Sequence, residues 1–160
     1  MKPHLSRVCF AGFVSTTLIA LMVFFVSPYL TGGPYDLAAW VSDQIDLSWI
    51  GGAAAHLIAG VLLLPAVYVL CFNGWLPGGV AVRGTAFGVV LWTLSQLVLL
   101  PQSSGGLLGS RPDGPRVVIE SLVGHLVYGI VLGILVGGRS KADDRMEDHH
   151  HSRPPVPRAA

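Results

Sequence analysis

Four long apolar stretches, separated by polar segments, are the most regular feature of the chain. They lie at about residues 8–28, 50–72, 80–100 and 117–137. Each approaches the roughly 20 residues that an α-helix needs to cross a hydrocarbon core of about 30 Å. A helix also satisfies its own backbone hydrogen bonds, as a segment surrounded by lipid must. The pattern therefore predicts an all-α fold in which residues 1–138 form a four-helix transmembrane bundle.

Composition excludes a water-soluble core and several classes of function. Of the 160 residues, 52% are hydrophobic and only 12% are charged, against about 25% charged in typical soluble domains. The net charge of +1 gives no reason to expect a nucleic-acid partner. No nucleotide-binding, zinc-binding or protease motif is present. The first stretch is longer than the apolar region of a signal peptide and lacks a cleavage site, so it is predicted to remain as a span.

Lysine and arginine are distributed unevenly among the polar segments. They precede the first stretch, follow the second and are frequent in the tail, whereas the first loop has none and the third has two. The positive-inside rule then places both termini in the cytoplasm and loops one and three outside. The tail, residues 139–160, is polar and rich in proline and is predicted to be disordered. Its three consecutive histidines, residues 149–151, are interpreted as part of a solvated tail, with no metal site predicted.

The first loop contains a helical pattern of its own. Leu37, Val41 and Ile45 recur every four residues, with Trp40 beside them, and acidic residues lie off this stripe. The spacing predicts a short amphipathic helix on the outer membrane surface. The third loop, residues 101–116, is rich in glycine, serine and proline and is predicted to be a flexible external loop.

Two pairs of short segments match between the halves of the chain. Residues 55–64 are AHLIAGVLLL and residues 124–133 are GHLVYGIVLG, and each follows a Pro-x-x-x-Gly-Gly segment, at 28–33 and 101–106. The matches predict a tandem duplication of a two-helix hairpin, with parallel copies related by an axis along the membrane normal. The alternative is chance similarity, because leucine, valine and glycine are common in membrane helices.

Four polar side chains inside the spans would be energetically costly to expose to lipid: His56, Gln96, Glu120 and His125. They are therefore predicted to form an intramembrane cluster that faces the interior of the bundle. At 1.5 Å per residue, the two histidines lie about 9 and 12 Å below the outer helix ends, and Gln96 lies about 7–8 Å below. Small residues flank the histidines at a spacing of four, which predicts that they lie on helix-packing faces.

Three interpretations of the matched histidines are open. The first is interhelical hydrogen bonding that only stabilises the bundle. The second is ligation of a b-type haem by His56 and His125, because neutral imidazole is a common iron ligand. The third is a proton or quinone site that uses the whole polar cluster. No catalytic residue is assigned.

Four segments carry a resemblance to a known family. They are residues 34–38 (PYDLA), 56–60 (HLIAG), 83–88 (RGTAFG, followed by Trp92) and 125–129 (HLVYG). Over about residues 10–137 the chain resembles a bacterial family of small four-helix integral membrane proteins of unknown function. Leu57 stands where the family often has an aromatic residue.

The resemblance implies a multi-pass protein of the bacterial inner membrane. The expected function is a non-enzymatic accessory or structural role, in association with a respiratory membrane complex. The alternative is a redox membrane protein that binds haem b through both histidines or interacts with quinone and protons. Expected partners are the lipid bilayer and either other complex subunits or a second copy of the chain.

Overall fold

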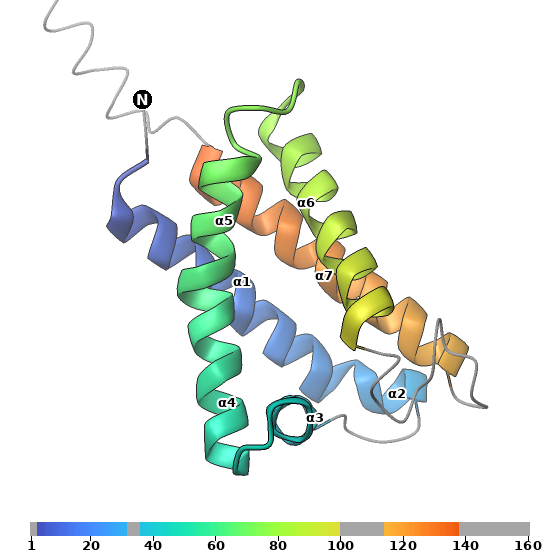
Figure 1. Ribbon diagram of the computed structural model, residues 1–160. Coiled ribbons are helices and arrows are strands. Elements are labelled where there is room, and N and C mark those ends of the chain that lie inside the picture. The colour runs from blue at the N-terminus through green and yellow to red at the C-terminus, as the bar shows by residue number, and fades with distance from the viewer. Residues whose placement is uncertain (1–2, 32–35, 100–113, 138–160) are drawn as a thin grey trace, which may run out of the picture.

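The computed structural model describes residues 3–31, 36–99 and 114–137, and the described residues are almost entirely helical (Figure 1). In chain order the helices are α1 (Leu5–Phe25), α2 (Ser27–Thr31), α3 (Leu37–Ile45), α4 (Trp49–Ile58), α5 (Leu64–Cys71), α6 (Val80–Leu94) and α7 (Gly114–Gly137). Two π-helical segments, η1 (Ala59–Leu63) and η2 (Ser95–Leu99), join α4 to α5 and extend α6.

Four continuous helical segments of the described chain are long and apolar enough to cross a membrane. They are Leu5–Tyr29, Trp49–Cys71, Val80–Val98 and Val118–Gly137. Their bounds lie within three residues of the predicted stretches, and the prediction of a helical chain with four such segments is confirmed. The predicted tail and most of the third loop lie outside the described residues. The tandem duplication stays a prediction.

The last two spans pack through glycine. Gly84 and Gly88 of α6 face Gly129 and Gly133 of α7, and the two helices run side by side in opposite directions (Figure 1). A Cβ on Gly129 would lie 2.8 Å from the backbone nitrogen of Gly88, and one on Gly133 would lie 2.9 Å from the Cα of Gly84. Real side chains never come this close, so the backbones themselves are in contact, as small residues at this spacing allow.

The first two spans pack in the same manner with different residues. A Cβ on Gly12 of α1 would lie 2.6 Å from the carbonyl oxygen of Val61, and Gly60 lies directly against the side chain of Thr16. The second span is not a regular helix at this point. It passes through η1, and Pro65 then removes one backbone donor at the start of α5. The irregular stretch therefore lies where α1 approaches most closely.

Apolar side chains fill the end of the bundle where α1 and α6 begin and α5 and α7 end. The ring of Phe87 lies 5.3 Å from that of Tyr68 and 4.9 Å from that of Phe72, measured between centroids. Ala11 and Leu132 are fully buried in the same core, and Phe72 packs against it while partly buried. Two arginines close the same end against backbone carbonyls: Arg7 Nε donates to Leu135 at 2.8 Å, and the Arg83 guanidinium donates to Asn73. We call this the arginine end.

The predicted helix of the first loop exists as α3, at the opposite end of the bundle (Figure 1). The Asp36 carboxylate caps it by accepting from the Ala39 amide at 2.9 Å and also accepts from the Trp49 indole N–H at 3.0 Å. These two donors hold the pKa of the Asp36 carboxyl below its usual value. Gly52 lets α4 approach α3 at Ala38 and Ser42. That α3 rests on the outer membrane surface stays a prediction.

Candidate functional site

A cavity of about 430 Å³ lies between the helices at the end remote from the arginines, and it is partly open to the outside of the protein. Residues from all four spans and from α3 line it. Most of the lining is apolar, with contributions from Ile19, Val23, Leu64 and Leu91, among others. The polar groups on its surface are therefore few, and each of them is significant for what the cavity can bind.

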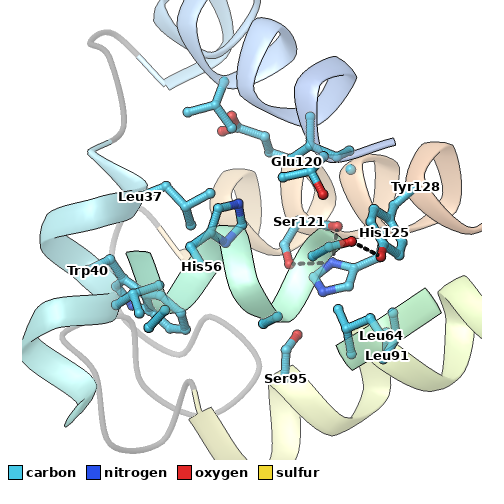
Figure 2. A pocket seen from close by; sticks show the side chains of 18 of the residues that line it. Leu37, Trp40, His56, Leu64, Leu91, Ser95, Glu120, Ser121, His125 and Tyr128 are labelled. Atoms are coloured by element: carbon cyan, nitrogen blue, oxygen red, sulfur yellow. Dashed lines mark hydrogen bonds between the residues drawn. The ribbon is translucent and has the colours of Figure 1, made fainter. Parts of the chain in front are cut away.

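Both predicted histidines lie on this one cavity (Figure 2). His56 enters from the last turn of α4, three residues before η1 begins, and His125 enters from the middle of α7. The Nε2 atom of His56 is buried and has no hydrogen-bond partner among the described residues. The structure thus places both histidines on the same cavity, and their action as a functional pair stays a prediction.

The imidazole of His125 is held in one orientation by its own helix. Its Nδ1 lies 2.7 Å from the carbonyl oxygen of Ser121, one turn earlier. A carbonyl oxygen can only accept, so Nδ1 carries the proton of this bond. In the neutral imidazole the other nitrogen, Nε2, is then unprotonated and acts as an acceptor or a ligand atom.

Glu120 also lines the cavity, whereas Gln96 does not. The Glu120 carboxylate forms no hydrogen bond or ion pair with the described residues, and no lysine or arginine is among the described residues of the lining. Gln96 is only 1% exposed, and both polar atoms of its side chain lack a hydrogen-bond partner among the described residues. The structure thus brings three of the four predicted cluster residues together and buries the fourth elsewhere in the third span.

Tyr128 separates the cavity from the packed core and was not predicted as a site residue. Its hydroxyl donates to the carbonyl oxygen of Gly60 at 2.6 Å. Gly60 belongs to η1, where the helical hydrogen-bond ladder is shifted and a carbonyl becomes available to an outside donor. Tyr128 and Gly60 follow His125 and His56 by three and four residues. This bond fixes the two histidine-bearing segments relative to one another.

A second hydroxyl of the lining comes from Ser95, the first residue of η2. Its Oγ donates to the carbonyl of Trp92 at 2.8 Å. Hydroxyls in membrane helices commonly bond to their own helix, so the sequence alone indicates no special role for Ser95 or Ser121. Both π-helical segments therefore contribute to the cavity, and such segments occur frequently at functional sites.

The wall on the first-loop side is the apolar stripe of α3. The cavity is lined by all four residues of that stripe, Leu37, Trp40, Val41 and Ile45. Figure 2 shows two of them, Leu37 and Trp40. Trp40 and Leu37 lie on the same side of the cavity as His56 (Figure 2). The first loop therefore contributes directly to the candidate site.

The described chain has four helices that are long and apolar enough to cross a membrane, as in α-helical membrane proteins, and they surround a cavity of about 430 Å³. The chain belongs to a family of unknown function, DUF6789, whose model matches residues 4–146. No curated protein and no solved structure matches the chain. Membership in a family without an assigned function agrees with the predicted resemblance. A bacterial origin and a family-wide role of the His-Leu motifs stay predictions.

Proposed function

We propose that this protein has a non-enzymatic accessory role in a bacterial cell membrane and binds a small lipid-soluble molecule in its cavity. The observation that carries the proposal is the gathering of His56, Glu120 and His125 around one mostly apolar space of about 430 Å³. Binding sites for small molecules are typically apolar pockets of about 300–1,000 Å³ with a few placed polar groups. Ionisable residues inside membrane spans are costly and mark functional sites.

Filling the cavity tests this proposal. Gly124 lines the cavity, and a Cβ there would meet only the Ile19 side chain, at 3.8 Å. Gly124→Leu therefore places a side chain in the cavity without forcing helices apart. Its control is Val123→Leu, on the adjacent residue, which is 42% exposed on the outer surface of the bundle.

The readout is native mass spectrometry of protein purified from its own membranes. We expect a small molecule to accompany the wild type and Val123→Leu and to be absent from Gly124→Leu. An equal amount bound to both variants would place the ligand elsewhere. A wild-type protein that carries nothing, and that no added lipid-soluble molecule stabilises, would refute the proposal.

Both termini are proposed to lie in the cytoplasm, which places the cavity in the outer half of the bilayer. The support is the lysine and arginine distribution together with the arginine end, where Arg7 and Arg83 bond to backbone carbonyls. The association with a respiratory complex, or with a second copy, stays a prediction from the resemblance.

A second candidate function is ligation of a b-type haem by His56 and His125. Two observations favour it: the buried Nε2 of His56 lacks a partner within the described part of the chain, and the Nδ1 bond of His125 leaves its Nε2 unprotonated in the neutral ring. Ligating histidines typically donate their other nitrogen to such a carbonyl. Charge argues against it, because haem propionates would meet the Glu120 carboxylate and no lysine or arginine of the described lining.

An optical spectrum decides between the two candidates. Protein purified from haem-replete cells and then reduced would show a Soret band if haem is bound. His125→Gln would abolish that band, because an amide is a poor iron ligand. The absence of a band in the wild type would end the haem hypothesis and leave the lipid-soluble ligand.

A further inference from the structure

We propose that residues 36–58 form a rigid arm that swings about the π-helical segment η1 and moves one wall of the cavity. The arm consists of α3, the turn that follows it and α4. Its motion does not depend on which molecule binds, and it therefore goes beyond the proposed function. Three boundaries coincide in the second span between Ile58 and Gly60: those of packing, of hydrogen bonding and of helix regularity.

The two helices of the arm bury each other and bury no residue against the rest of the described bundle. Gly52 is the one buried residue of α4, and Ser42 is the one buried residue of α3. A Cβ on Gly52 would lie 2.6 Å from the backbone nitrogen of Ser42, so the two residues cover one another. From η1 onward the second span is different, because Gly60, Pro65 and Tyr68 are buried. The packed body of the bundle therefore begins at η1.

Hydrogen bonds also stay within the arm. The Asp36 carboxylate joins its two helices, because it accepts from the Ala39 amide of α3 and from the Trp49 indole of α4. Among the described residues, no side-chain hydrogen bond links residues 36–58 to another part of the chain. The arm is thus rigid within itself, and it is joined to the described bundle by apolar contacts and by the continuing second span.

The pivot is the point at which the helical hydrogen bonding of the second span changes. The Leu64 N–H bonds to the Ala59 carbonyl, five residues earlier, and the next residue, Pro65, has no N–H. The Gly60 carbonyl accepts the Tyr128 hydroxyl instead, which anchors the pivot to the fourth span. Sharp helix kinks occur at π-helical segments and at proline, and hinges are positions at element ends that absorb changes in backbone angles. The second span has both features at the boundary of the arm, whereas α1 and α7 are unbroken α-helices.

Distance from the pivot decides which parts of the cavity wall move. At 1.5 Å per residue, Trp49 lies about 16 Å from Gly60, and His56 lies about 6 Å from it. A turn of about 20°, the size of an ordinary kink, moves these two residues by about 6 Å and about 2 Å. The α3 stripe that contains Trp40 moves with the Trp49 end, because Asp36 holds α3 to α4. The α3 wall therefore leaves the body while the two histidines keep nearly the same separation, and such a motion admits a molecule wider than the resting opening.

Distances between paired spin labels test the motion in lipid nanodiscs, after the two native cysteines are replaced by serine. Three pairs of exposed positions are compared: Asp43 with Val123 across the pivot, Asp43 with Ala54 within the arm, and Val82 with Val123 within the glycine-packed body. We expect the distance distribution of the first pair to be about 6 Å broader than those of the other two. The reason is that the swing breaks no hydrogen bond and exposes no buried residue.

Substitutions at the pivot assign the motion to η1. Pro65→Ala supplies an N–H donor to the carbonyls of η1 and is expected to narrow the Asp43–Val123 distribution by about half. Tyr128→Phe withdraws the donor of Gly60 and is expected to broaden the distribution. Its control is Tyr68→Phe, whose hydroxyl has no partner among the described residues and whose loss should leave the distribution unchanged. Because Tyr128→Phe removes only one oxygen atom, it provides the same test if Pro65→Ala fails to fold.

The outcomes that would overturn the hinged arm are distinct from a failure of the proposed function. Equal widths in all three pairs would refute a swing of the arm against the body. A broad distribution for Asp43 with Ala54 would mean that α3 moves apart from α4, so that no rigid arm exists. Pivot variants that leave the first distribution unchanged would place the hinge away from η1 and refute its assignment. None of these measurements uses a ligand, so the binding function is decided separately by Gly124→Leu.

Discussion

Replacing Tyr128 with phenylalanine removes one oxygen atom from the wall between the cavity and the packed core. In the native protein this hydroxyl is buried, with the residue 6% exposed, and donates to Gly60 at 2.6 Å. The substitution leaves the ring in place and the Gly60 carbonyl without its donor. Because Gly60 lies in η1, that carbonyl has no regular helical partner to which it can return.

The expected cost lies between two estimates. Interhelical hydrogen bonds measured in membrane proteins are worth about 0.6 kcal/mol on average and about 1.7 kcal/mol at most. A buried acceptor left unsatisfied costs about 1–3 kcal/mol. We therefore expect Tyr128→Phe to lower the free energy of unfolding by about 1–1.5 kcal/mol.

Tyr68 provides a matched control. It is fully buried, it packs against Phe87, and its hydroxyl has no partner among the described residues. Tyr68→Phe removes the same atom without breaking a bond and relieves the burial of a polar group. We expect it to leave the stability unchanged or to raise it by up to about 1 kcal/mol.

Reversible unfolding in mixed micelles, followed by circular dichroism, measures both variants under the same conditions. The reasoning predicts that the two substitutions differ in sign or by at least about 1 kcal/mol. Equal effects would show that the Tyr128–Gly60 bond contributes no more than an unpaired hydroxyl. A larger loss in Tyr68→Phe would refute the assignment of these two environments.

Three further predictions concern packing, capping and orientation. Gly88→Ala places a Cβ against the His125 backbone and should lower the free energy of unfolding by about 1–3 kcal/mol through overpacking. Gly124→Ala should leave the stability nearly unchanged, and equal shifts of the melting temperature in the two variants would contradict the glycine interface. The lowered pKa of Asp36 implies that its carboxylate stabilises the fold fully above the unfolded pKa of about 3.9, and that this contribution is lost as pH falls through the lower folded value. Asp36→Asn should remove this dependence of stability on acidic pH, whereas Asp43→Asn should not. Melting curves at several acidic pH values measure the difference. A reporter fused in the third loop should give a signal outside the cell membrane, and one fused to the carboxyl tail should give a cytoplasmic signal. An outside signal from the tail would contradict the proposed topology.

The spans and their packing faces could be predicted because both depend on local pattern. The length of an apolar run decides whether a helix crosses the bilayer, and small residues four apart lie on one face of a helix whatever its neighbours are. The placement of His56 and His125 on one cavity followed from the similarity of their segments, which gave them comparable depths. These features needed no knowledge of the tertiary contacts.

The remaining features depend on contacts that the pattern does not encode. An amphipathic helix such as α3 has the same sequence whether its apolar stripe meets lipid or a cavity, so the direction of Leu37 and Trp40 could not be predicted. The π-helical segments shift the residues that follow them around the helix axis. Gln96, the second residue of η2, is buried but does not line the cavity with the other three residues of the predicted cluster.

The arginine end of the bundle is filled by packed side chains, and the cavity lies toward the opposite end. A molecule dissolved in the bilayer is confined to a thin layer and is far more concentrated there than in the surrounding water. If that local concentration is near 1 mM, a Kd of about 1 mM is enough to fill half of the sites. This Kd corresponds to a binding free energy of only about −4 kcal/mol. A few hydrogen bonds and a modest apolar contact are then enough for occupancy, and exchange with the membrane pool can be fast. Affinities measured after dilution into detergent would therefore underestimate the occupancy that the proposed ligand reaches in the membrane.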